Sequence, residues 1–173
     1  LTSAPSPWPI VGRREELALL QECLDSEGTP RGLVVTGAAG VGKTRLVTEG
    51  VAAAEQIGRA TARATATAVA QTIPLGAFAH LLPAEETRAT TTLELLREAR
   101  HSLLASLEAS PLVLCVDDAH LLDPASATLL QQLVAAGGVV AFVTVRIGEP
   151  VPDAVTALWK DHECAYLELE PLS

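Results

Sequence analysis

The sequence predicts an α/β fold in which helices cover both faces of a parallel β-sheet. Segments of helical periodicity alternate with short apolar runs along the 173-residue chain, a pattern typical of β-α units. Three of the runs are apolar throughout, as strands buried on both faces of a sheet are. Only 3% of the residues are aromatic, whereas 49% are hydrophobic. The core must therefore consist of Ala, Val, Leu and Ile, which favours helices packed on a sheet over an aromatic-rich sandwich.

The first half of the chain is predicted to begin with a linker and to supply two strands. Residues 1–9 contain three prolines and small polar residues, so we expect an extended lead-in to one domain that spans residues 10–173. A helix follows, because Leu17, Leu20 and Leu24 share one face of it. The predicted elements are a helix at residues 12–25, a strand at 33–36, a helix at 43–56 and a strand at 59–66.

The second half of the chain is predicted to supply three more strands. Leucines recur along one stripe of an amphipathic helix that Pro111 brings to an end. A pair of glycines, Gly137 and Gly138, closes the helix that comes next. The predicted elements are a loop with a short helix at residues 73–83, helices at 92–109 and 124–136, and strands at 112–118, 139–145 and 164–169.

The loop GAAGVGKT lies between the first predicted strand and the helix that follows it. Its spacing, a glycine, four residues and then Gly-Lys-Thr, is that of a phosphate-binding P-loop. Glycines let successive backbone N–H groups turn inward, and the next helix directs its positive end to the same point. A glycine-rich turn with a chance lysine is the alternative, which the flanking strand and helix disfavour. The candidate nucleotide-binding residues here are Gly37, Ala38, Ala39, Gly40, Val41, Gly42, Lys43, Thr44 and Arg45.

Four side chains complete the predicted chemistry of this loop. Lys43 would reach the β- and γ-phosphates and take part in catalysis, and the Thr44 hydroxyl would bind Mg²⁺. Asp117 ends the apolar run LVLCVDD and is the second candidate ligand of Mg²⁺. Asp118 could orient or deprotonate the attacking water. The alternative for Asp118 is that it caps the turn into the next helix.

Arg146 directly follows the predicted strand at residues 139–145. Ligands of open α/β sheets bind at the carboxyl ends of the strands, so we expect Arg146 to contact a γ-phosphate as a catalytic residue. A solvated surface arginine is the alternative. His120 follows the two aspartates and either lines the site or packs in a turn.

Composition limits the partners of the chain. The net charge is −9 and the pI about 4.8, which disfavours direct binding of nucleic acid. Three cysteines lie far apart without metal-ligand spacing, so we expect buried thiols and a cytoplasmic location. No signal peptide is predicted. The uncharged stretch at residues 124–145 contains Gln131, Gln132 and a glycine pair, so no membrane span is expected.

Five segments occur in the order expected for the STAND class of P-loop ATPases: IVGRREELALL, GAAGVGKTRL, LVLCVDDAHLLD, VTVR and LELEPLS. The chain resembles the nucleotide-binding domain of large LuxR-type bacterial regulators. The resemblance implies an AAA-like, three-layer α/β/α P-loop fold with a five-stranded parallel sheet of order 5-1-4-3-2. It also implies that Val11, Gly12 and Arg13 contact adenine and ribose, that Asp117 holds Mg²⁺ through water, that Asp118 is the catalytic acid and that Arg146 is a sensor.

The resemblance further implies that the chain is one domain of a longer protein. Members of the class continue into a helical lid, a winged helix and a DNA-binding domain, which would be partners of this one. The predicted function is an ATP- and ADP-binding, Mg²⁺-dependent switch of a bacterial signal-transduction or transcription regulator. We expect slow hydrolysis, because no residue is recognisable as an arginine finger. Nucleotide-dependent self-association is a further expectation.

Two other functions stay open at this point. One is a nonhydrolysing nucleotide-binding interaction module. The other is a small-molecule kinase, which the scarcity of arginines after Arg100 disfavours, since Arg146 alone follows it. Guanine specificity is unsupported, because LWKD lacks the asparagine of a guanine-reading motif.

Overall fold

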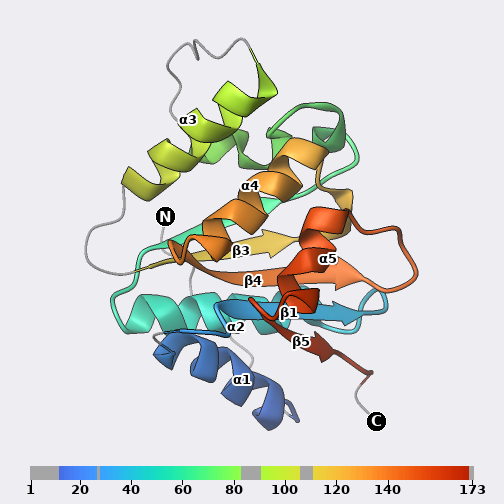
Figure 1. Ribbon diagram of the computed structural model, residues 1–173. Coiled ribbons are helices and arrows are strands. Elements are labelled where there is room, and N and C mark those ends of the chain that lie inside the picture. The colour runs from blue at the N-terminus through green and yellow to red at the C-terminus, as the bar shows by residue number, and fades with distance from the viewer. Residues whose placement is uncertain (1–11, 27, 83–90, 106–110, 172–173) are drawn as a thin grey trace.

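The computed structural model describes residues 12–26, 28–82, 91–105 and 111–171. Its centre is a five-stranded sheet in which every neighbouring pair of strands is parallel. The order β2-β3-β4-β1-β5 confirms the expected order 5-1-4-3-2, and β4 separates the P-loop strand from β3 (Figure 1). The strands are β1 (Gly32–Gly37), β2 (Thr61–Thr65), β3 (Leu112–Asp117), β4 (Val139–Arg146) and β5 (Ala165–Glu168).

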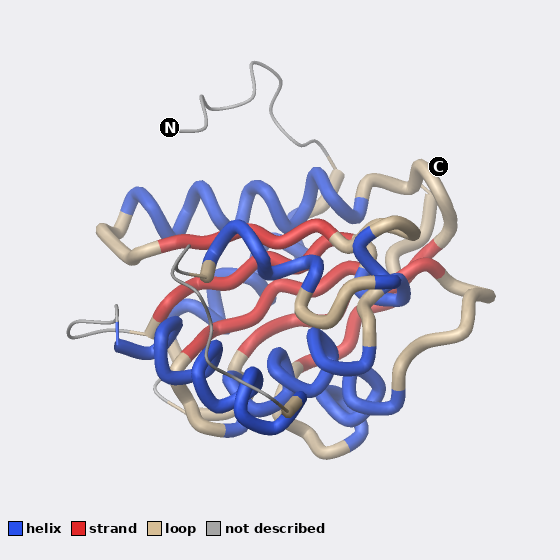
Figure 2. Tube along the Cα trace, turned by 90° about the horizontal axis from the view of Figure 1, so that it is seen from above, coloured by secondary structure: helices blue, strands red, loops and turns tan. Residues whose placement is uncertain are grey.

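Helices form a layer on each face of this sheet, as Figures 1 and 2 show. One layer contains α1 (Arg14–Asp25) and α2 (Lys43–Gln56). The opposite layer contains α3 (Thr92–Ala105), α4 (Pro124–Ala135) and α5 (Asp153–Lys160). Three short 3₁₀ turns, η1 (Ala70–Thr72), η2 (Gly76–Leu81) and η3 (Ala119–Leu121), connect these elements. The predicted three-layer α/β/α fold is therefore confirmed.

The two layers bury separate cores because successive side chains of a strand point to opposite faces. On β1, Leu33 and Val35 pack towards α1 and α2, whereas Val34 packs towards the other layer. All six residues of β1 are buried, as are the first seven of the eight in β4. Burial on both faces explains why these strands are apolar runs in the sequence.

Several boundaries differ from the predicted ones by a few residues. The P-loop helix was predicted residue for residue, since the motif sets its start. The strand predicted at residues 59–66 is shorter at both ends, and β4 extends by one residue to include Arg146. The helix predicted at residues 92–109 is described only as far as Ala105. The lead-in at residues 1–9 lies outside the described residues. None of the described helices is long and apolar enough to cross a membrane.

Candidate functional site

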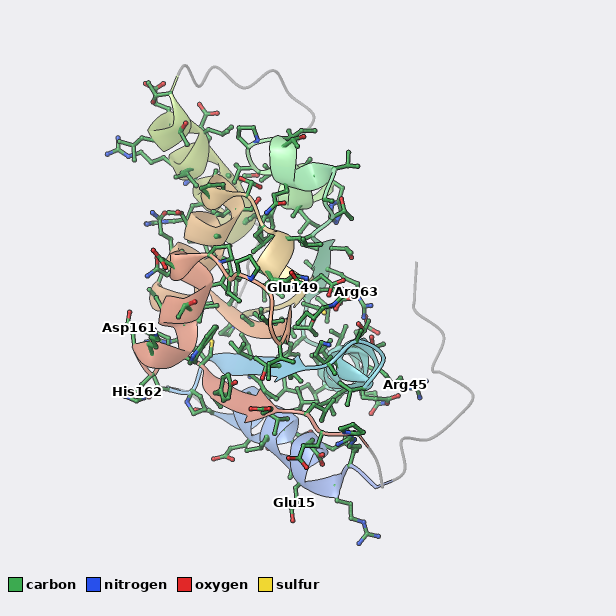
Figure 3. All side chains as sticks on the ribbon, turned by 90° about the vertical axis from the view of Figure 1, so that its right-hand side faces the viewer. Glu15, Arg45, Arg63, Glu149, Asp161 and His162 are labelled. Atoms are coloured by element: carbon green, nitrogen blue, oxygen red, sulfur yellow. The ribbon has the colours of Figure 1, made fainter. Side chains whose placement is uncertain are left out.

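The register of the sheet brings the predicted site residues to one edge. Gly37 at the end of β1 lies opposite Arg146 at the end of β4. Val116 of β3 pairs with Val143 of β4, so Asp117 and Thr144 are neighbours one residue further along. Figure 3 views this edge, the side to which the arrowheads of Figure 1 point. Carboxyl ends of parallel strands are where such folds bind ligands.

The P-loop has the backbone that close approach of a phosphate requires. Gly42 precedes α2 with a φ of 102°, a left-handed conformation that glycine adopts without strain. At Gly37, an added Cβ would lie 2.6 Å from the carbonyl oxygen of Leu169, so a side chain cannot be accommodated. No side chain caps the first turn of α2. Its backbone N–H groups therefore remain available for an anion at the positive end of the helix.

Lys43 folds back over the P-loop. Its Nζ donates to the carbonyl oxygens of Gly37 at 2.9 Å and Ala38 at 2.8 Å, and the residue is only 8% exposed. Burial lowers the pKa of Lys43, and the charge of Arg146 acts in the same direction, whereas Asp118 and Asp117 oppose the shift. The ammonium group thus lies among carbonyl oxygens at the mouth of the loop, where phosphate oxygens can replace them.

Thr44 and Asp117 form a pair of hard oxygen donors. The Thr44 hydroxyl lies 3.0 Å from each carboxylate oxygen of Asp117, although the two residues are 73 positions apart. Hydroxyl and carboxylate oxygens are ligands that Mg²⁺ accepts together with water and phosphate. The described residues contain no cluster of three or more His, Cys, Asp or Glu suited to a metal. Two oxygen donors suit a cation that obtains its remaining ligands from a nucleotide and water.

Thr144 holds both aspartates, a role that the sequence analysis did not assign. Its hydroxyl donates to Oδ1 of Asp117 and accepts the backbone N–H of Asp118 at 2.9 Å, and the residue is 0% exposed. The signal was present in VVAFVTV, because Thr144 is the one hydroxyl in an otherwise apolar strand. A buried hydroxyl needs a partner, and the partners are the two candidate site residues.

Asp118 has an unusual backbone conformation. Its φ is 54°, which is uncommon for a residue with a Cβ. The carbonyl of Asp118 accepts the N–H of Leu121 at 2.8 Å, but the side chain makes no capping hydrogen bond. The capping role considered as an alternative for Asp118 is therefore filled by another residue. Asp123 caps α4, accepting the N–H groups of Ala125 and Ser126 at 3.0 Å each.

Arg146 is exposed at the end of β4, and its guanidinium forms no ion pair with a described residue. Its backbone N–H donates to Nδ1 of His120 at 3.4 Å, and the next N–H, of Ile147, donates to the carbonyl of Gly37 at 3.2 Å. Burial lowers the pKa of His120, which favours the neutral ring, the form in which Nδ1 can accept. Arg146 and Ile147, which we call the sensor segment after the role predicted for Arg146, are thus attached both to the P-loop and to the turn after Asp118.

The remaining candidates are placed differently from the P-loop set. Arg13 is buried and donates to the side chain of Glu16 and to the carbonyl of Glu170, so it joins α1 to the end of β5. Gly12 is exposed, with a φ of 78°, and Val11 lies outside the described residues. Arg45 pairs with Glu49 one turn along α2, and Figure 3 shows it directed away from Glu149 at the centre of the view.

The sequence matches the AAA ATPase domain family over residues 9–145, which include the P-loop and both aspartates. The chain belongs to this family. No curated protein matches this AAA ATPase domain. Three solved structures that resemble it are 15–20% identical to it, so the likeness concerns the fold alone.

The AAA ATPase domain resembles three proteins of known structure from archaea and bacteria. The ORC1 protein of Aeropyrum pernix in complex with DNA is 20% identical, with a TM-score of 0.63 over 96% of this chain and 47% of that one. Cdc6p of Pyrobaculum aerophilum is 15% identical, with a TM-score of 0.63 over 99% and 48%. AMPPCP-bound DnaA of Aquifex aeolicus is 16% identical, with a TM-score of 0.59 over 94% and 48%. The AAA ATPase domain spans about half the length of these structures.

Proposed function

We propose that this AAA ATPase domain is the Mg²⁺-ATP-binding, slowly hydrolysing switch of a bacterial signal-transduction or transcription regulator. The observation that carries the proposal is the position of the Thr44 hydroxyl, 3.0 Å from the Asp117 carboxylate. This pair adjoins Lys43 and the first turn of α2, which no side chain caps. Thr144 joins this pair to Asp118. A site for a phosphate chain, a cation and a water molecule is thereby supported at one edge of the sheet.

Binding would begin with the phosphates entering the P-loop. Backbone N–H groups of residues 38–44 would donate to phosphate oxygens, and Lys43 would exchange its bonds to Gly37 and Ala38 for bonds to the β- and γ-phosphates. Thr44 and Asp117 would hold Mg²⁺, with Asp117 acting through water. The cation, when bound, neutralises charge on the phosphates.

Hydrolysis would use the residues beyond Asp117. Asp118 would orient a water molecule towards the γ-phosphate and accept its proton as the new bond from oxygen to phosphorus forms. The bond between the γ-phosphorus and the bridging oxygen would break in the same step, so that ADP and phosphate leave. Arg146 would contact the γ-phosphate. Departure of that phosphate after hydrolysis would break the contact and release the sensor segment. Because Arg146 and Ile147 are hydrogen-bonded to His120 and Gly37, a displacement at the γ-phosphate would reach both the P-loop and the β4–α5 loop.

We expect slow turnover because the side chains of two other arginines near this edge are bonded within the domain. Arg45 pairs with Glu49, and Arg63 donates to the Thr48 hydroxyl at 3.0 Å. Neither is directed as an arginine finger, a group that increases the rate about 10³- to 10⁵-fold. Further domains of the parent protein would complete the switch. A lid and a winged helix would close over the nucleotide, and a DNA-binding domain would carry the regulatory response. Nucleotide-dependent self-association belongs to the same proposal.

Thermal melts with ATP, ADP and GTP, each with and without Mg²⁺, test the nucleotide assignment. We expect stabilisation by adenine nucleotides, larger with Mg²⁺ for ATP, and little by GTP. A phosphate-release assay should give well under one turnover per second. Equal shifts with GTP, or rapid turnover by the chain alone, would contradict the proposal. The regulatory role is tested in the full-length parent by comparing DNA binding in the ATP-bound and ADP-bound states.

A further inference from the structure

A groove of about 710 Å³ lies directly behind the sensor segment. Its walls are the turn after Asp118 with the start of α4, the end of the β4–α5 loop with the start of α5 (residues 149–154), and Gln71 of η1. We call it the α4–α5 groove. None of its lining residues binds the phosphate chain in the function proposed above. The groove nevertheless lies next to the candidate site, because the segments that form two of its walls directly follow Asp118 and Arg146 in the chain.

The lining of the α4–α5 groove is apolar with an acidic rim. Leu122 and Ala127 are buried in its floor and Val151 is half-buried. Glu149 and Asp153 are both exposed at its edge. No lysine or arginine is among the described residues that line it. Such a surface is complementary to apolar side chains flanked by positive charges.

The α4–α5 groove is physically connected to the nucleotide site through His120. The His120 ring lies in the groove wall, is 6% exposed, and accepts the backbone N–H of Arg146. The β4–α5 loop, which forms another wall, begins at Ile147. The backbone N–H of Ile147 donates to the carbonyl oxygen of Gly37 in the P-loop. A ligand that moves either wall therefore moves a contact of the sensor arginine or of the P-loop.

We propose that the α4–α5 groove binds a partner polypeptide segment with apolar side chains flanked by lysine or arginine, and that nucleotide state and occupancy are coupled. The coupling rests on the proposed function, whereas binding of the segment does not. A second copy of this chain is a less complementary occupant, because its net charge is −9. The segment would belong to a separate partner protein.

The test uses fluorescence anisotropy with two labelled 12-residue peptides of leucine, proline and arginine, one of which has glutamate in place of arginine. We expect the basic peptide to bind and the acidic peptide not to bind. The double variant Glu149→Gln/Asp153→Asn should weaken binding of the basic peptide about tenfold or more. A charge-matched control, Glu15→Gln/Asp161→Asn, removes exposed carboxylates that Figure 3 shows away from Glu149 and should bind like the unmodified chain.

Coupling is measured by repeating the titration with Mg²⁺ and either ADP or a nonhydrolysable ATP analogue. The peptide affinities should differ about fivefold or more, and by linkage the peptide should change the nucleotide affinities by the same factor. His120→Ala should abolish the difference in peptide affinity between the two nucleotide states, and His120→Asn, which retains an acceptor, should restore part of it.

Three outcomes would overturn the proposal of a docking groove. They are no binding of the basic peptide, equal loss of binding in the charge-matched control, and concentration-dependent self-association that the Glu149→Gln/Asp153→Asn change abolishes. Peptide binding by a chain that binds no nucleotide in calorimetry would support the groove and overturn the proposed function. Nucleotide binding without peptide binding would overturn the groove alone.

Discussion

The Thr144 hydroxyl donates a hydrogen bond to the Asp117 carboxylate from the neighbouring strand. The same oxygen accepts the backbone N–H of Asp118. One buried group on β4 thus sets the orientation of a candidate Mg²⁺ ligand and of a candidate base. Since Arg146 is two residues further along β4, a single strand positions the acidic side chains and the candidate sensor arginine.

Replacing Thr144 with valine should impair hydrolysis more than binding. The change keeps the shape but leaves the N–H of Asp118 without a partner, which costs about 1–3 kcal/mol of unfolding free energy. We expect phosphate release to fall about tenfold or more, while the affinity for ADP changes less than about threefold. Thr144→Ser is the matched control and should retain most of the activity. Equal phosphate release by the valine and serine variants would show that the hydroxyl does not position the site.

Replacing Asp117 with asparagine should reduce the contribution of Mg²⁺ to ATP affinity. The amide keeps a hydrogen-bond acceptor but loses the negative charge that attracts the cation. We expect the Mg²⁺-dependent gain in ATP affinity to fall about tenfold, with the Mg²⁺-free affinity unchanged or slightly higher. Isothermal titration at several Mg²⁺ concentrations measures both quantities. An unchanged Mg²⁺ dependence would remove Asp117 from the cation site.

Asp123 should contribute strongly to stability without contacting nucleotide. Its Oδ1 accepts two N–H groups of the first turn of α4 and the N–H of Leu75 at 3.2 Å. Asp123→Ala removes a helix cap and leaves a buried donor unpaired, so the free energy of unfolding should fall by about 2–4 kcal/mol. Asp123→Asn keeps an acceptor and should lose less. Urea denaturation measures the differences, and a loss below about 0.5 kcal/mol for the alanine variant would contradict this account.

The three cysteines should be unreactive in the folded protein. Burial raises the pKa of Cys23 and of Cys115 to about 11 and that of Cys164 to about 12, against about 8.5 in an unfolded chain. The folded state therefore disfavours thiolates, and stability should fall as the pH rises above about 9, where unfolded thiols ionise. A thiol reagent at pH 8 should modify the protein only after denaturant is added. Rapid modification of the native protein would contradict the burial.

Much of the fold was predictable because local patterns determine it. Strands buried on both faces are apolar throughout, and the P-loop motif sets the start of α2 at Lys43. The strand order came from the resemblance to a family, because pairing between distant strands leaves little trace in one sequence. The bounds of helix α5 were not predicted, because its eight residues are too few to show a clear helical periodicity.

The candidate site was only partly predictable for a related reason. Lys43, Thr44, Asp117 and Asp118 carry motif spacing, so their residue types could be recognised. The bond of Thr144 to Asp117 depends on the register of β3 against β4, which sequence spacing does not show. The bond of Arg13 to Glu170 joins residues 157 positions apart, and no local pattern announces it.

Calorimetric titration of Lys43→Ala with ATP and Mg²⁺ tests the central claim most directly, with Lys160→Ala, an exposed lysine of α5, as the control. In the proposed function Lys43 would provide a charge-assisted contact to the phosphates, so its removal should weaken ATP binding about 10- to 100-fold. The control should bind as the unmodified chain does. No measurable association of ATP with the unmodified chain, or identical affinities for the two variants, would contradict the account.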